Sequence, residues 1–268
     1  LYQDVMMKLG RYEEAKGEYE DMAERHTGNA LYQILAARLQ RESHRRIELL
    51  QKALKADGGF EPARRALARE LFLVRDYKGA VEHLNWILKK DEKDLEALLL
   101  LAAIERERSR YDEAMKYLRR AAEANPQSPV PLVEMGRVEQ ERAHFAEAVK
   151  HFEEASKRGM LDWQALLGWG DSLVGLGKKK EAVAVWRRAL ALPLTPEQFA
   201  VFANRCTTLF VRPPTKELQQ PLQKARKLAT TDPKKALQLL ENLNKQSPDN
   251  PVLLSAFAAV AMLAGEPN

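Results

Sequence analysis

Two glycine-containing stretches of this sequence could in principle bind a phosphate or a nucleotide. Gly175-Leu176-Gly177-Lys178 resembles part of a phosphate loop, in which backbone N–H groups cradle the anion, but the G-x4-G-K-[ST] spacing is absent. Gly168-Trp169-Gly170 lies inside a helical pattern and is not a dinucleotide fingerprint. We therefore predict a turn for the first stretch and a helix for the second, with no cofactor.

The histidines and the cysteine show no catalytic or metal-binding pattern. Cys206 is the single cysteine, which excludes an internal disulfide, and no histidine lies near it in the sequence. We expect it to pack as a small apolar side chain rather than to act as a nucleophile. Metal binding is not expected because H-E-x-x-H and paired-cysteine spacings are missing. The histidines are scattered along the chain: His26, His44, His83, His144 and His151.

Carboxylates are plentiful, but catalytic carboxylates must converge in a pocket that shifts their pKa values. Here they alternate with arginines on predicted helices, a pattern typical of a solvated, ion-paired surface. We therefore predict that the chain is not an enzyme. The clearest examples of these acidic residues are Glu105, Glu107, Glu139 and Glu141.

The elements that would carry these residues are helices. Apolar residues recur at i, i+3, i+4 and i+7 throughout, without sustained strand alternation. The stretch 129–160 shows a denser pattern, in which a large residue, an apolar one and a small one on a first helix precede A-x3-F and a further alanine on a second. These residues are Leu132, Met135, Gly136, Ala148, Phe152 and Ala155.

The pattern recurs in phase at 34-residue steps. Gly136 is matched by Ala68, Ala102 and Gly170, and the large residue Phe152 is matched by Leu84, Leu118 and Trp186. On these residues the chain resembles the tetratricopeptide repeat family over nearly all of its length. The resemblance implies an all-α fold, a right-handed superhelical α-solenoid of helix-turn-helix repeats. Such hairpins cannot bury their own apolar faces and therefore stack.

The register predicts three regions. Residues 1–196 form a solenoid with a partial first repeat, a short repeat at about 28–59, and four regular repeats at 61–94, 95–128, 129–162 and 163–196. Residues 197–214 hold an irregular or inserted helix, which runs to about residue 211. Residues 215–268 hold one further repeat and part of another. Because both ends fall inside repeats, we expect the chain to be part of a longer protein, and we predict no compartment or oligomeric state.

In this family the first helices line a concave groove, and the resemblance places particular residues there. It implies a run of arginines beside an aliphatic floor, which would suit a partner with acidic and aliphatic side chains. An ion-paired groove without a ligand is the alternative. The groove positions are Arg65, Arg69, Phe72, Leu99, Ala103, Arg106, Val133, Arg137, Gln140, Leu167, Asp171 and Val174.

Charge is unevenly distributed along the chain. Residues 163–268 contain 14 Lys and Arg against 8 Asp and Glu, whereas residues 1–162 contain 29 against 30. The basic last third would be compatible with an anionic polysaccharide, although a solvated lysine-rich exterior also explains it. Specific nucleic-acid binding is not expected because exposed aromatic residues do not alternate with the basic ones.

These features favour a non-catalytic scaffold for protein–protein interaction that binds a peptide or protein in the concave groove. The alternatives are a bacterial solenoid of exopolysaccharide secretion or outer-membrane assembly that recruits a polymer-modifying enzyme, and the targeting arm of an enzyme whose catalytic domain lies elsewhere. No signal peptide or membrane-spanning run is apparent, so periplasm and cytoplasm both remain open.

Overall fold

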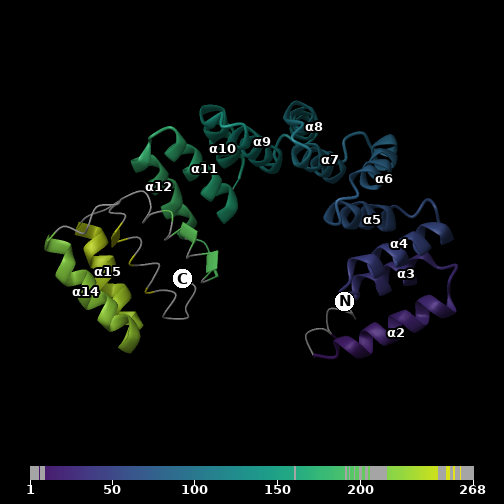
Figure 1. Cartoon of the computed structure of the whole chain (residues 1–268), viewed down its shortest axis with the longest axis horizontal. Helices are drawn as coiled ribbons and strands as arrows, with labels where there is room; N and C mark the ends of the chain where they lie inside the picture. The colour runs from purple at the N-terminus through teal and green to yellow at the C-terminus, as the bar shows by residue number, and fades with distance from the viewer. Residues whose placement is uncertain are drawn as a thin grey trace. The chain divides into compact units, whose positions relative to one another are not determined.

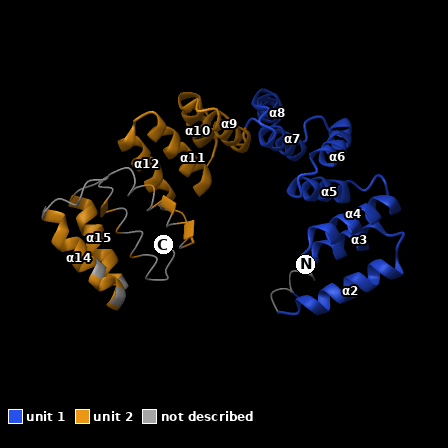
Figure 2. Ribbon diagram, viewed as in Figure 1, with its two compact units in different colours: residues 1–126 blue, residues 127–268 orange. Residues whose placement is uncertain are grey.

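The structure is a computed structural model that describes residues 10–159, 161–190 and 216–246, and several further positions (6, 192, 194, 195, 197, 198, 201, 202, 205, 252, 253, 256 and 260). No strand occurs among these residues. The chain divides into two compact units, residues 1–126 and 127–268 (Figure 2). Cys206 and most of the predicted helix at 197–211 and of the partial repeat after 252 lie outside the described residues.

Unit 1 consists of helices joined by short turns. Its first helices are usually 13 residues long, but α3 has nine, which accounts for the 32-residue spacing between Ala36 and Ala68. The described helices are α2 (Tyr12–Arg25), α3 (Ala30–Arg38), α4 (Ser43–Ala56), α5 (Glu61–Leu73), α6 (Tyr77–Lys90), α7 (Leu95–Glu107) and α8 (Tyr111–Ala124).

Unit 2 continues the same pattern. Its regular first helices begin at Val130 and Trp163, close to the repeat starts that the sequence predicts. The last hairpin has a core of its own, formed with residues near the end of the chain such as Leu253 and Val260. The described helices are α9 (Val130–Glu141), α10 (Phe145–Arg158), α11 (Trp163–Gly175), α12 (Lys179–Leu190), α14 (Lys216–Thr231) and α15 (Pro233–Gln246).

Within each unit, consecutive helices pack as hairpins, and the hairpins stack (Figure 1). The hairpins are α3–α4, α5–α6, α7–α8, α9–α10, α11–α12 and α14–α15. Second helices also contact the next first helix, as α4 contacts α5 and α10 contacts α11. First helices touch one another in the pairs α3–α5, α5–α7 and α9–α11. The predicted all-α solenoid is therefore confirmed.

A left-handed residue ends the first helix of each regular repeat. Its φ is 63° at Arg75, 57° at Ser109, 59° at Ala143 and 75° at Gly177, one residue every 34. The next N–H donates to the carbonyl five residues back, as from His144 to Glu139 at 2.8 Å. This hydrogen bond closes a Schellman motif, which turns the chain into the second helix. Three of the four positions carry a side chain where glycine is usual.

Small residues on the first helices leave room for large side chains of the second helices. A Cβ added at Gly136 would lie 2.8 Å from Phe152 Cζ, and one added at Gly170 would overlap the indole nitrogen of Trp186. Phe152 and Trp186 are 0% and 1% exposed. In the two preceding repeats the same register positions hold Ala with Leu, as at Ala102 and Leu118. Glycine therefore occurs where the partner is aromatic, because the helix axes must approach closely.

Replacing Ala143 by glycine is expected to raise stability. The left-handed conformation costs a side chain about 1 kcal/mol, and glycine adopts it freely. Gly177→Ala should lower stability by about the same amount, since no neighbour lies within 4 Å of the added Cβ. Urea unfolding midpoints measure both changes. Ala184→Gly, on the exposed face of α12, is the control and should lower the stability of the protein. If Ala143→Gly also lowers the stability, the left-handed turn assignment is contradicted.

The pair Gly170 and Trp186 should show strong energetic coupling. Gly170→Ala is expected to cost about 2 kcal/mol through overpacking, and Trp186→Leu about 3 kcal/mol through the cavity it leaves. The double variant restores the Ala–Leu pair of the earlier repeats and should be more stable than the sum of the single effects predicts. A double-mutant cycle by chemical unfolding measures this coupling. Simple additivity would mean that the two positions do not determine the helix separation.

Candidate functional site

The predicted groove positions of unit 1 lie on α5 and α7, two first helices in contact with each other. Arg65, Phe72, Leu99 and Arg106 are partly exposed, and the Arg69 side chain is 59% exposed. Phe72 lies 6.0 Å from the Tyr77 ring, centroid to centroid. The stretch from Arg65 to Arg106 therefore presents mixed aromatic, aliphatic and basic side chains on neighbouring helices.

The arginines of unit 1 are held by carboxylates of the chain itself. Arg65 donates two hydrogen bonds to Asp94, at 2.8 and 2.5 Å. It also donates to Glu61, at 2.6 and 3.1 Å. Arg69 forms an ion pair with Glu96. Asp94 is at the same time the N-cap of α7, since its carboxylate accepts the N–H of Ala97 at 2.8 Å.

This network favours the charged forms of both Arg65 and Asp94. The hydrogen bonds that Arg65 donates lower the pKa of Asp94, and donating to Asp94 and Glu61 raises the pKa of Arg65. The two arginines are paired with three carboxylates, Glu61, Asp94 and Glu96, so the cluster carries one more negative than positive charge. The expected excess of positive charge is therefore compensated within unit 1.

The groove positions of unit 2 lie on α9 and α11, which also contact each other. Arg137, Gln140 and Leu167 are partly exposed, whereas Val133 is 8% exposed and packs inward. Arg137 donates to Glu134 at 2.5 Å. Gln140 donates to the Gly168 carbonyl at 3.3 Å and so links the two first helices.

Asp171 on α11 faces an arginine one repeat further along. Arg205 lies 3.2 Å from it, and the two residues are 34 positions apart. Burial raises the pKa of Asp171, although the Arg205 charge opposes the shift. The nearby Phe202 is 1% exposed and meets the Trp163 ring edge-on at 6.3 Å. Phe202 and Arg205 therefore both contact residues of α11.

The expectation of a solvated acidic surface is wrong for Glu105 and Glu139, which are 8% and 7% exposed. Each occupies the end of a first helix and pairs with the turn that follows: Glu105 with Arg108 at 3.1 Å, and Glu139 with His144 at 2.8 Å. The ion pairing was predictable from the sequence. The burial was not, because it depends on the Schellman turn folding back over the helix end.

Glu105 and Glu139 belong to different repeats, and each pairs with basic residues that follow its own helix. Within the described part of the chain, no group of three His, Cys, Asp or Glu residues is placed to hold a metal ion. None of the described helices is long and apolar enough to cross a membrane.

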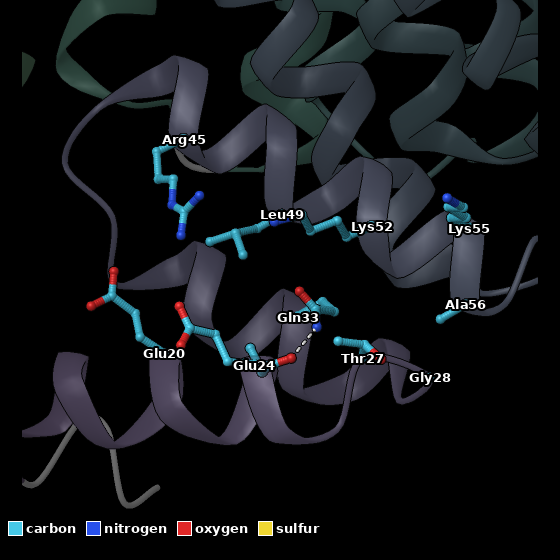
Figure 3. A pocket seen from close by; sticks show the side chains of 11 residues that line it. Glu20, Glu24, Thr27, Gly28, Gln33, Arg45, Leu49, Lys52, Lys55 and Ala56 are labelled. Carbon is cyan, nitrogen blue, oxygen red and sulfur yellow. Dashed lines mark hydrogen bonds between the residues drawn. The ribbon is translucent and has the colours of Figure 1, made fainter.

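A pocket of about 500 Å³ opens elsewhere, between α2, α3 and α4 (Figure 3). Glu20 and Glu24 of α2 face Arg45 and Lys52 of α4, and Gln33 of α3 lies between the two helices. Sequence reasoning missed this pocket because the short repeat gives no motif there. The only available signal was an uncharged polar residue, Gln33, among the apolar positions of a short first helix.

Comparison with known proteins supports the repeat assignment. Residues 65–129 and 133–199 match the family described as Tetratricopeptide repeat. No curated protein matches the chain significantly.

Several solved structures share the fold. PilW, a widely conserved type IV pilus biogenesis factor, is 19% identical, with a TM-score of 0.61 over 75% of this chain and 94% of its own. TTC0263, a thermophilic TPR protein in Thermus thermophilus, is 18% identical, with a TM-score of 0.52 over 60% and 89%. The MamA RS-1 ArsTM double mutant is 16% identical, also with a TM-score of 0.52, over 59% and 90%.

At these identities the likeness to the solved structures concerns the fold alone. The chain belongs to the tetratricopeptide repeat family.

Proposed function

We propose that this chain is a non-catalytic scaffold that binds a segment of a partner protein along its first helices. Tetratricopeptide repeats generally bind peptides or proteins without performing chemistry, and the family assignment supports this class of function. The exopolysaccharide-export and enzyme-targeting alternatives stay predictions, since no described residue bears on them.

The observation that carries the proposal is periodic exposure along the first helices. On α11, Leu167, Asp171 and Val174 are partly exposed, whereas most of the residues between them are buried in the hairpin core. On α7, Leu99, Ala103 and Arg106 show the same spacing of exposure. These positions lie outside the buried core of the hairpin, and the proposed partner would contact the chain there.

The arginines differ in what a partner carboxylate would have to displace. Arg65 sits in a bidentate, partly buried pair with Asp94, and breaking it would leave the α7 cap without its counter-charge. Arg137 pairs with Glu134 within one helix, an arrangement worth only about 0.3–0.5 kcal/mol. We therefore propose that Arg65 stabilises the fold, whereas Arg69 and Arg137 bind carboxylates of the partner.

The proposed partner segment carries acidic and aliphatic side chains. Its carboxylates would exchange with Glu134 at Arg137 and with Glu96 at the more exposed Arg69. Its aliphatic side chains would pack on Leu99 in unit 1 or Leu167 in unit 2. A short apolar anchor flanked by a charge-assisted hydrogen bond is a common basis for peptide recognition.

Peptides selected from a random dodecapeptide display library against this chain should combine Asp or Glu with Leu, Ile or Val. Arg137→Glu should weaken the binding of those that engage unit 2 by about tenfold, or about 1.4 kcal/mol, because it places a repulsive charge opposite the peptide carboxylate. Fluorescence anisotropy of the labelled peptides measures the affinity.

Lys150→Glu is the matched control, because Lys150 lies on the exposed face of α10 and the substitution changes the net charge equally. Thermal unfolding of both variants verifies that they fold. Equal weakening by the two substitutions would show a general charge effect and would contradict binding along the first helices. So would selected peptides that lack acidic residues.

A further inference from the structure

The pocket between α2, α3 and α4 has two walls of opposite charge. Glu20 and Glu24 project from α2, and Arg45, Lys52 and Lys55 project from α4 (Figure 3). Its lining also includes the apolar Ala23, Leu49 and Ala56. The walls are second helices of successive hairpins, so this pocket uses different residues from the first-helix positions discussed above.

Gln33 on the intervening helix has an unused hydrogen-bond acceptor. Its side chain is 2% exposed, and its Nε2 donates to the Ala23 carbonyl at 2.6 Å, which fixes the orientation of the amide. The Oε1 atom is buried and has no hydrogen-bond partner. A buried acceptor without a donor is unfavourable, so a ligand that supplies an N–H group gains from satisfying it.

The charges on the two walls are unequally compensated. Arg45 and Lys52 turn toward Glu48, at 2.6 and 2.7 Å, and their hydrogen bonds lower the pKa of Glu48 to about 2. Glu20 accepts only the Gln40 amide at 2.9 Å. Neither Glu24 nor Lys55 forms an ion pair with any residue that the structure describes. Besides the hydrogen bond to Glu48, the charge of Glu24 helps to raise the pKa of Arg45, but a ligand could pair with Glu24 and Lys55 without breaking an ion pair.

We propose that this pocket binds an extended segment of a partner protein that carries one basic and one acidic side chain. A backbone N–H of the segment donates to Gln33 Oε1, its basic side chain pairs with Glu24, and its acidic side chain pairs with Lys55. The apolar lining at Ala23 and Leu49 accommodates small side chains between them. This is a second binding site, independent of the first-helix surface.

The dimensions fit such a segment. Arg45 and Ala56 mark the ends of the α4 wall. The helix rises about 16 Å between them, which is the length of about five extended residues. The volume of about 500 Å³ lies within the range of ligand pockets. Side chains an odd number of positions apart on an extended chain point to opposite sides, as the two walls require.

The test uses synthetic peptides of that form. Ac-Ala-Lys-Ala-Ala-Glu-Ala-NH2 and its sequence reversal, which allow for either chain direction, are titrated into the isotopically labelled full chain. Binding is followed by NMR through the side-chain amide of Gln33. At least one of the two peptides should shift this resonance and saturate at low millimolar concentration. Ac-Ala-Gln-Ala-Ala-Gln-Ala-NH2, without charges, should bind more weakly by an order of magnitude.

Glu24→Gln and Lys55→Gln should each weaken binding roughly fivefold, the upper end for an exposed ion pair. Both residues lack ion pairs in the described structure, so their substitution should leave the fold intact. Glu82→Gln and Lys89→Gln, exposed on α6 in the same unit, are matched controls and should leave the affinity unchanged.

Three results would overturn the proposal: no shift at Gln33 with either charged peptide, equal binding of the uncharged peptide, or unaltered affinity in both pocket variants. Saturable binding of free lysine or glutamate without binding of the peptides would also refute it, because the pocket would then take a small zwitterion. Arg137→Glu should have no effect on these titrations, so failure here is distinguishable from failure of the first-helix proposal.

Discussion

Trp186 lies across α11 at Gly170, where even a methyl group would overlap its ring. The same kind of contact joins Phe152 to Gly136 one repeat earlier. These close approaches set the separation of the two helices in each hairpin. The separation in turn determines which surface of the hairpin packs against the next one. A single hairpin of this length cannot bury its apolar residues alone, so stacking follows from the same contacts. The stacking in turn aligns successive first helices, on which the proposed binding surface depends.

Much of the fold could be predicted from the sequence because these contacts repeat. The 34-residue steps of small and large residues located the regular repeats, and the helices begin close to the predicted starts at 61, 95, 129 and 163. The left-handed turns were less visible. Arg75, Ser109 and Ala143 adopt a conformation that usually marks glycine, so only Gly177 gave a local signal. Tertiary stacking imposes this conformation on the other three.

The exposure of the proposed first-helix surface could be predicted from the sequence, but its ion pairs could not. Register alone identified residues such as Leu99, Arg137 and Leu167, which are partly exposed on first helices. The pairing of Arg65 with Asp94 could not be read from the sequence, because it joins residues 29 positions apart on successive hairpins. The pocket at Gln33 was missed for a related reason, since its walls come from three helices of the irregular short repeat and its neighbour. Periodicity describes what repeats share, and these two features depend on where repeats differ.

Two separate surfaces are thus proposed for binding, one built on first helices and one between second helices. The central claim is that partners dock on the first helices. Hydrogen exchange of the chain, with and without a saturating first-helix ligand selected as above, tests it most directly. The account predicts slower exchange in first helices such as α7 or α11, with α6, α8, α10 and α12 unchanged. Slowing confined to the second helices, or none at all, would contradict it.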